Sequence, residues 1–482
     1  MRVLMISDVY FPRVNGVSTS IQTFAREFTA LGHQVTLIAP DYGQSDPEPF
    51  ELIRIPSRYL PFDPEDRILR WGWLRDHHRQ LAAADFDLVH IHTPFIAHYA
   101  GLALARRLGL RVVESYHTFF EQYLDKYIPL VPSAWLRLLA RRFSAAQCND
   151  VDALVVPSQA MLDVLAGYGT RTPAAVIPTG IELVQFGSGD GARFRQAWGI
   201  APERPLLVHA GRLAFEKNCE FLLEMLVQVK AQVPEVLLAI AGEGPARRQL
   251  ERQARQLGLA DSVLFTGYLK RDGSLEDFYR AGDAFVFASR TETQGLVLLE
   301  SMALGTPVVA LAEMGTREIL RPEAGCLIAA DETAHFAAQC VRLLRDPQLR
   351  AELGARARTY AQSWSAPVLA QRMLNFYGEC LAKPAVAVAP SASPVTAGPR
   401  SARAWASTRD GSAAVAMSHR QDAAAWTDPA RGLDVQCAEV VAAGPAARST
   451  SRPTPAEPAR WGVPEPLLLH PIGDEPEPIA AD

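Results

Sequence analysis

The chain has 482 residues, 48% of them hydrophobic, and a formal net charge of −5. This length exceeds what one ordinary hydrophobic core supports, so the sequence predicts two packed domains and a further segment. The negative charge and the absence of a long Lys/Arg run exclude the basic face that nucleic-acid binding requires, so we expect no nucleic-acid partner.

The six cysteines show neither CxxC pairs nor even spacing, which argues against a zinc site or a disulfide framework and fits a reducing cytosol. The apolar run within residues 1–8 is shorter than the apolar region of a signal peptide and predicts a buried first strand. No stretch of about 18 apolar residues occurs, so we expect no transmembrane helix and a cytoplasmic location.

Short apolar runs alternate with longer segments of helical period along the first half of the chain. This alternation predicts βαβ units and a parallel sheet covered on both faces by helices. Helices are expected at 20–31 and at 158–166, the second with Ser158 as N-cap and Gly167 as its stop. The predicted strands are 3–6, 35–39, 52–55, 88–91, 112–115, 153–156 and 175–177.

The same alternation begins again after residue 200. The predicted fold class is therefore α/β, with two Rossmann-like, doubly wound parallel-sheet domains that face a cleft. Ligands of such sheets bind beyond the carboxyl ends of the strands, so we expect the site in the loops there. The strands of this half are predicted at 206–209, 236–241, 263–266, 284–288, 307–311 and 326–328.

One strand of the second half runs into a loop that holds Gly295 and then into a helix. The first free N–H groups of that helix, near Leu296 and Val297, form an anion site where we expect a phosphate. Glu300 lies roughly one turn deeper, because a helix rises about 1.5 Å per residue, and this distance suits a ribose hydroxyl. Glu292 precedes the helix and is free to reach a sugar.

A second loop follows the first strand of the second half and contains Arg212 and Lys217. The guanidinium offers a planar fork for phosphate oxygens, and the ammonium offers a mobile point charge. Together they can neutralise a diphosphate leaving group, which is the task of a divalent cation in other transferases. We therefore expect neither a metal nor another cofactor. The glycine-rich turn at 242–245 is expected to be a packing turn that borders the nucleotide.

Two loops of the first half are expected at the same site. Small residues around Gly16 connect the first strand to the first helix, where a backbone must approach ligand phosphates. His117 ends another strand at that edge and is placed to contact the reacting sugar.

Two patterns leave a metal site open as an alternative. Residues 85–87 have the D-x-D form of metal-dependent transferases, but they precede a strand, whereas a nucleotide–metal site should follow one. His90 and His92 alternate along a short strand and could form a metal pair, although a packed strand edge fits them better.

This combination of motifs resembles the family-4 glycosyltransferases of the GT-B fold over residues 1 to about 381. The matching pieces, in the family's order, are Asn15-Gly16-Val17, His117-Thr118, Ile177-Pro178-Thr179-Gly180, Gly211-Arg212, Lys217-Asn218, the turn at 242–245 and the motif from Glu292 to Glu300. The resemblance implies an N-terminal acceptor-side domain at 1–180 and a nucleotide-sugar-binding domain at 181–365. It further implies a crossover helix at 366–381 that packs on the first domain, before an Ala/Pro-rich, disordered tail at 382–482.

The resemblance also implies residue roles. Glu292 and His117 would be catalytic, positioning the sugar and stabilising charge rather than acting as nucleophiles. The donor-binding residues would be Gly16, Arg212, Lys217, Gly295, Leu296 and Val297 at the diphosphate, Glu292 and Gln294 at the sugar, Glu300 at the ribose and Leu269 in the base pocket. The implied chemistry is metal-independent hexosyl transfer with retention, by same-face attack through an oxocarbenium-like state.

The stretch at 117–127 resembles the diacylglycerol glucosyltransferases of this family, which implies UDP-glucose as donor and a membrane lipid as acceptor. The basic amphipathic segment at 135–143 and the Trp/Arg stretch at 69–75 can lie in a membrane interface, while ordinary packing on the sheet remains the alternative. Peripheral contact with the inner face of the cytoplasmic membrane is thus expected. The acceptor or membrane side would include Tyr123, Tyr127, Trp135, Arg141 and Arg142.

Other functions stay open at this point. The donor could be GDP-mannose, and the acceptor could be a glycan of lipopolysaccharide or exopolysaccharide. A nucleotide-sugar epimerase could share the two-domain architecture, and it would release epimerised donor without an acceptor. A non-catalytic scaffold would bind the sugar nucleotide without turnover.

Overall fold

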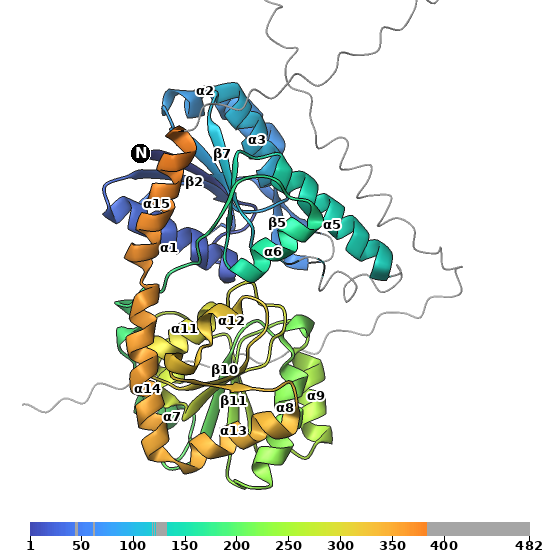
Figure 1. The fold of residues 1–482 in the computed structure, drawn as a ribbon, viewed down its shortest axis with the longest axis vertical. Helices are drawn as coiled ribbons and strands as arrows, with labels where there is room; N and C mark the ends of the chain where they lie inside the picture. Colours follow the sequence, from blue (N-terminus) through green and yellow to red (C-terminus); the bar gives the residue numbers. More distant parts are fainter. Residues whose placement is uncertain (44–46, 61–62, 118, 120, 122–132, 383–482) are drawn as a thin grey trace, which may run out of the picture. The chain divides into compact units, whose positions relative to one another are not determined.

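The computed structural model describes residues 1–43, 47–60, 63–117, 119, 121 and 133–382 (Figure 1). Within these residues the chain forms two parallel sheets, each covered by helices on both faces, which confirms the predicted α/β class with two doubly wound sheets. Of the tail expected at 382–482, Ala382 is the last residue of helix α15 (Ala366–Ala382), and residues 383–482 lie outside the described residues, as does the segment at 122–132.

In the described part of the N-terminal half, seven parallel strands form the first sheet, in the order β3-β2-β1-β6-β7-β8-β9. Successive residues of β1 point to opposite faces: Leu4 and Ile6 join one buried apolar cluster, and Val3 and Met5 join the other. The strands are β1 (Arg2–Ile6), β2 (Gln34–Pro40), β3 (Glu51–Ile55), β6 (Leu88–Ile91), β7 (Arg111–Ser115), β8 (Ala153–Val156) and β9 (Ala174–Val176).

Helices cover the two faces of this sheet unequally. Side chains of α1 (Gly16–Ala30) and α15 (Ala366–Ala382) pack on one face. The other face is covered by α2 (Trp71–Ala83), α3 (Ile96–Leu108), α5 (Ser133–Asn149) and α6 (Gln159–Tyr168). The sheet also has beside it an antiparallel pair, β4 (Ser57–Leu60) and β5 (Asp63–Leu69), which the sequence did not predict.

The second sheet, as far as the structure describes it, has six parallel strands in the order β12-β11-β10-β13-β14-β15. In both sheets the order reverses beside a central strand, at β1/β6 and at β10/β13, and loops at such switch points carry ligand sites. The strands are β10 (Leu206–Ala210), β11 (Leu237–Ala241), β12 (Val263–Gly267), β13 (Ala284–Phe287), β14 (Val308–Leu311) and β15 (Cys326–Ala329).

Two clusters of apolar side chains pack on the faces of the second sheet. One face is covered by α7 (Gly191–Ala197), α10 (Ser274–Ala281), α11 (Leu296–Ala303), the short α12 (Thr316–Ile319) and α14 (Pro347–Ala361). The other is covered by α8 (Cys219–Lys230), α9 (Arg247–Gln256) and α13 (Thr333–Arg345). Short 3₁₀ turns lie at η2 (Gln185–Gly187), η3 (Phe215–Lys217), η4 (Pro322–Ala324) and η5 (Gln362–Trp364).

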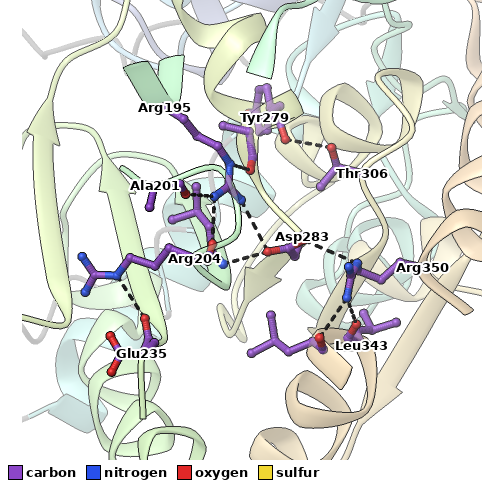
Figure 2. A network of polar contacts seen from close by, with 12 residues as sticks. Arg195, Ala201, Arg204, Glu235, Tyr279, Asp283, Thr306, Leu343 and Arg350 are labelled. Carbon is purple, nitrogen blue, oxygen red and sulfur yellow. Dashed lines mark hydrogen bonds and ion pairs between the residues drawn. The ribbon is translucent and has the colours of Figure 1, made fainter. Parts of the chain in front are cut away.

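A polar network ties helices to the amino ends of β10 and β13 (Figure 2). The Asp283 carboxylate accepts from the Leu206 backbone N–H at 2.8 Å and pairs with Arg195 at 3.5 Å and Arg350 at 3.4 Å. Arg195 also donates to the Arg204 carbonyl at 2.8 Å. Since these contacts lie at the amino ends of the strands, they brace the end of the sheet opposite the candidate site.

The chain returns to the first sheet through α15, which runs beside α1 (Figure 1). Tyr377 packs against Phe28 with ring centroids 5.7 Å apart. Just before α15, the chain hydrogen-bonds to the segment that first left this sheet: Ile181 N–H donates to the Trp364 carbonyl at 2.8 Å, and Ala366 N–H donates to the Ile181 carbonyl at 3.0 Å.

The ends of the helices differ from their predicted positions more than the ends of the strands do. Helix α1 begins at Gly16 rather than at residue 20, because the Asn15 side chain caps it by accepting from Ser18 N–H at 2.8 Å. Helix α6 starts after Ser158 as predicted but passes Gly167 and ends at Gly169, whose φ of 97° allows the left-handed cap. Among the described residues, no helix has the length and apolar character to cross a membrane.

Candidate active site

The loop between β13 and α11 carries the predicted donor contacts. Gly295, with φ of 97°, lets the chain turn directly into α11, so the first N–H groups of that helix belong to Leu296 and Val297. The Glu292 carboxylate pairs with the Lys217 ammonium, Oε1 to Nζ, at 2.5 Å. The structure thus brings together two predicted residues that are 75 positions apart.

The Lys217–Glu292 pair is mostly enclosed, with side-chain exposures of 24% and 13%. Burial alone lowers the pKa of Lys217, but the charge of Glu292 and the hydrogen bond to it outweigh burial, and the pKa is raised. Lys217 is therefore a stable cation beside the amino end of the loop that leads into α11.

The backbone of the Gly211–Arg212 loop is fixed from two sides. The turn at 242–245 lies directly against it: a Cβ on Gly242 would lie 1.9 Å from the Gly211 carbonyl oxygen. Beneath the loop, His209 donates through Nδ1 to the Val286 carbonyl at 3.0 Å and accepts through Nε2 from the Cys219 thiol at 3.5 Å. Arg212 itself is half-buried. The turn at 242–245 is thus a packing turn against this loop.

Glu300 points into the second domain from α11 and is 2% exposed. Its Oε1 accepts from Arg271, and its Oε2 accepts from the Tyr279 hydroxyl at 2.8 Å. The Arg271 guanidinium also lies 5.5 Å from the ring centroid of Phe186. A carboxylate offers about four acceptor positions, so Glu300 keeps capacity for a ribose hydroxyl.

Sequence reasoning missed Arg271 and Tyr279. A signal for Arg271 was present, because it follows β12 at the carboxyl edge of the sheet, directly after the stretch expected to line the base pocket. Leu269 of that stretch is partly buried and packs on the apolar cluster beneath.

The side chain of Gln294 has a partner that the sequence did not indicate. Its Oε1 accepts from Thr179 N–H at 2.8 Å, and its Nε2 donates to the Thr179 carbonyl at 2.7 Å. One acceptor and one donor position of the side-chain amide are thus engaged by Thr179, and Gln294 is only 7% exposed.

From the first domain, His117 contacts the loop between β13 and α11, residues 288–295, which we call the donor loop. Its carbonyl oxygen accepts from the Thr293 hydroxyl at 3.2 Å, although the two residues are 176 positions apart. Its ring lies against His92, Nε2 to Nδ1 at 3.4 Å, and burial lowers the pKa of His117 to about 4. The imidazole is therefore neutral near pH 7. Gly16, in the first turn of α1, is positioned by the Asn15 cap.

The alternative metal patterns form other contacts. His90 is bonded to Ser115 at 2.8 Å and to the Tyr377 hydroxyl at 2.6 Å. The Asp87 carboxylate accepts from Arg2 N–H at 2.7 Å, at the amino end of the sheet. Among the residues that the structure describes, no group of three or more His, Cys, Asp or Glu side chains could hold a metal ion.

The expected acceptor-side residues are only partly described. Tyr123 and Tyr127 lie outside the described residues. Trp135 on α5 is 65% exposed, and Arg142 is also exposed. Arg141 pairs with Glu121, Nη2 to Oε1, at 2.5 Å.

Comparisons with known proteins agree with this architecture. The family model for glycosyltransferase family 4 matches residues 14–185, and the model for glycosyl transferases group 1 matches residues 190–360. The alpha-monoglucosyldiacylglycerol synthase of Streptococcus pneumoniae is 35% identical over 64% of this chain and 71% of its own length. The GDP-mannose-dependent alpha-mannosyltransferase of Mycobacterium tuberculosis is 29% identical over 78% of this chain and 96% of its own length.

Among solved structures, the sucrose-phosphate synthase of Thermosynechococcus elongatus superposes with a TM-score of 0.63 at 23% identity. The alignment covers 78% of this chain and 98% of that one, which shows the shared fold. Both halves of the chain thus match the same kind of enzyme, a hexosyltransferase that uses a nucleotide-sugar donor and a glycolipid or glycan acceptor. The chain belongs to the family-4 glycosyltransferases of the GT-B fold.

Proposed function

We propose that this enzyme transfers glucose from UDP-glucose to a membrane lipid such as diacylglycerol, without a metal and with retention of the anomeric configuration. The observation that carries the proposal is the Lys217–Glu292 pair at the loop that leads into α11, which joins a cation for the diphosphate to a carboxylate for the sugar. Similarity to the pneumococcal alpha-monoglucosyldiacylglycerol synthase supports glucose as the sugar and diacylglycerol as the acceptor.

Charge compensation supports transfer without a metal ion. A diphosphate leaving group carries negative charge that must be stabilised as its bond to the sugar breaks. Lys217, Arg212 and the free N–H groups at Leu296 and Val297 come from two loops at the carboxyl edge of one sheet. Each contributes a positive charge or partial charge, and Lys217 and the N–H groups are held in place by Glu292 and by the start of α11.

The proposed transfer step follows from these groups. The acceptor hydroxyl attacks the anomeric carbon on the face that the phosphate leaves, the bond between that carbon and the phosphate oxygen breaks, and the departing phosphate takes the hydroxyl proton. Glu292 retains acceptor positions for sugar hydroxyls besides the one that Lys217 occupies. His117 is neutral, so it orients the sugar without adding positive charge near the developing cation.

Helix α5 supports contact with a lipid surface. Trp135, Leu138, Leu139 and Arg142 follow the i, i+3, i+4, i+7 spacing of one helical stripe, and all four are exposed. Leu136 and Ala140 are buried against the domain. An exposed stripe with apolar side chains and a cation suits the interface of an anionic membrane. We place the enzyme peripherally at the inner face of the cytoplasmic membrane.

Mannosyl transfer from GDP-mannose is the second candidate. It is favoured by the mycobacterial GDP-mannose-dependent relative, which aligns over 96% of its own length. Nothing in the contacts of Lys217 or Glu292 depends on the nucleotide base, so the two donors must be separated by experiment.

The deciding experiment offers labelled UDP-glucose and GDP-mannose, in separate reactions, to the enzyme with vesicles of diacylglycerol and anionic phospholipid. We expect labelled glucosyldiacylglycerol with an α-linkage from UDP-glucose, at an unchanged rate in EDTA, and no product with Glu292→Gln. Product from GDP-mannose alone, a β-linkage or loss of activity in EDTA would overturn the corresponding part of the proposal.

Membrane contact is tested by sedimentation with vesicles at low salt. The double variant Trp135→Ser/Leu139→Ser should lose most of its binding to anionic vesicles, because it removes apolar area from the stripe on α5. Val368→Ser is the matched control, since Val368 is an equally exposed apolar residue on α15. Equal binding by the stripe variant and the control would contradict docking through α5.

A further inference from the structure

The side-chain amide of Gln294 binds, through both its oxygen and its nitrogen, the backbone of Thr179 in the segment that leaves the first sheet. Gln294 is 7% exposed and Thr179 is 5% exposed. The Thr179 N–H donates to Gln294 Oε1 at 2.8 Å, and Gln294 Nε2 donates to the Thr179 carbonyl at 2.7 Å. The side-chain amide thus pairs with a backbone unit as a neighbouring strand would, through two bonds of good length.

The contact continues from Thr179 into the first domain. The Thr179 hydroxyl donates to the Ser20 hydroxyl of α1 at 2.8 Å. One residue before Gln294, the Thr293 hydroxyl donates to the His117 carbonyl at 3.2 Å. The donor loop is therefore attached to the first domain at two points, through Thr179 to Ser20 and directly to His117.

The segment around Thr179 has little freedom to move independently. Gly180 lies so close to the start of α15 that a Cβ there would be 2.4 Å from the Ala366 Cα. Ile181 is hydrogen-bonded on both sides, to Trp364 and to Ala366. A side chain that binds Thr179 is therefore attached to a rigid junction rather than to a loose loop.

Most groups expected at the diphosphate belong to the second domain: Arg212, Lys217 and the amino end of α11. Gly16, at the start of α1, is the one from the first domain. These second-domain groups do not depend on the contact with Thr179 to bind the nucleotide. Sugar transfer requires more precise geometry than nucleotide binding, because the acceptor oxygen must lie within about 3–3.5 Å of the anomeric carbon. A contact that fixes the position of the donor loop relative to the first domain helps to maintain this distance.

We infer that Gln294 is a positioning residue for sugar transfer, which aligns the donor loop with the acceptor side by holding the backbone of Thr179 and, through it, Ser20. The inference rests on the proposed function for the identity of donor and acceptor, and on the described contacts for the role of Gln294. The sequence placed Gln294 at the sugar; the inference adds a role for its side chain, whose amide oxygen and nitrogen both bind Thr179.

The test compares Gln294→Met with Gln228→Met. Methionine keeps the length of the side chain and removes both hydrogen bonds. The control removes a single side-chain bond, from Gln228 to the Thr333 hydroxyl at 2.7 Å, which lies within the second domain. For Gln294→Met we expect kcat of transfer to fall by about tenfold to hundredfold. Affinity for UDP, with GDP as second probe, and donor KM should stay within about twofold of the wild type.

Two further measurements separate positioning from folding. Amide hydrogen exchange of the peptide 177–182 should become faster in Gln294→Met and stay unchanged in Gln228→Met, because only the first variant exposes the Thr179 N–H. Ser20→Ala should reduce kcat less than Gln294→Met, and the double variant should be no worse than Gln294→Met alone, because both residues act through Thr179.

Three results would overturn the inference. A rise in donor KM that matches the loss in kcat/KM would make Gln294 a sugar ligand. A melting temperature lowered far more than in the control, with nucleotide affinity reduced in parallel, would make its role structural. If kcat of Gln294→Met equals that of the wild type, Gln294 has no role in positioning. If the wild type transfers nothing from UDP-glucose, the donor proposal fails, and the exchange experiment still decides the contact: unchanged exchange in Gln294→Met refutes it.

Discussion

At the scale of single residues, the Arg271–Glu300 pair shows how the second domain holds a charge below its surface. Glu300 is almost completely buried, and its carboxylate accepts from Arg271 and Tyr279. Burying such a charge is unfavourable unless it is paired and hydrogen-bonded, and here both conditions are met. The carboxylate expected to contact the ribose therefore has a fixed orientation before the donor arrives.

Replacing Arg271 with methionine should destabilise the protein by about 3 kcal/mol, because it leaves a buried carboxylate without its cation. The methionine stem retains the contact area against Phe186. Urea unfolding followed by circular dichroism measures the change. Donor affinity should fall as well, since Glu300 would no longer be held by two donors.

Arg193→Met is the matched control for this prediction. Arg193 also pairs with a buried carboxylate, that of Asp277, but its own side chain is 63% exposed. Water can replace part of what that guanidinium supplies, so the loss of stability should be much smaller. Equal destabilisation by the two variants would show that the Arg271–Glu300 pair has no special role.

The sequence indicated which loops carry the candidate residues, but it did not indicate the partners of those residues. Glu292, Lys217, Gln294 and His117 stand at carboxyl ends of predicted strands, and the topology of the sheets determines that such loops lie near one another. Their contacts with one another and with Thr179 depend on backbone distances across more than 70 positions. No local pattern encodes those distances, so the partners emerge only from the fold.

At the scale of elements, strands were predicted more closely than helix ends. The central strands of the two sheets are short runs of apolar residues buried on both faces, which gives a strong local signal, whereas the edge strands β3, β9, β12 and β15 are only partly buried. The end of α6 depended on which of two glycines, Gly167 or Gly169, adopts a positive φ. The β4–β5 pair was missed because DPEDRIL at 63–69 is charged, contains a proline and lacks an apolar alternation.

The turn at 242–245 allows a prediction about how elements support the site. Gly242 has φ of 137°, and a Cβ would approach the Gly211 carbonyl oxygen to 1.9 Å. Gly242→Ala should therefore displace the loop that carries Arg212, weaken nucleotide binding and lower stability by several kcal/mol, of which backbone strain alone accounts for about 1. Calorimetry with UDP and thermal unfolding measure the two effects.

Gly258→Ala separates backbone strain from the close approach. Gly258 also has a positive φ, 69°, but a Cβ there would meet nothing within 4 Å. This variant should lose about 1 kcal/mol and keep its nucleotide affinity. If Gly242→Ala behaves in the same way, the turn does not support the loop.

At the scale of the whole molecule, both sheets contain buried histidines whose pKa values are lowered. Burial lowers the pKa of His90 to about 3 and those of His117 and His209 to about 4, and it lowers the pKa of His92 well below the ordinary value. Close neighbours add to burial in the first sheet, where the rings of His90 and His92 have centroids 4.0 Å apart. The folded protein therefore keeps these rings neutral well into the acid range.

The consequence for stability has a definite sign. Near pH 7 the rings are mostly neutral in the folded and the unfolded chain. Below about pH 6.5 these histidines bind protons in the unfolded chain but not in the folded chain, so the free energy of unfolding decreases as the pH falls towards 4. Each such histidine adds up to about 1.4 kcal/mol per pH unit to this loss. Glu114 has the opposite effect on the pH dependence of stability, because burial raises its pKa and the folded state favours its protonated form.

We therefore expect the free energy of unfolding, measured by urea titration, to fall steeply between pH 6.5 and 4. His209→Gln keeps a donor for the Val286 carbonyl and removes one titrating group, so it should lower stability at pH 7.5 but flatten the acid slope. Lys217 and Glu292 face His209 from their own loops and remain unchanged in this variant. His335→Gln is the control, because His335 is exposed and its replacement should leave the slope intact. An unchanged slope in His209→Gln would mean that acid unfolding starts elsewhere, at the carboxylates of the ion pairs.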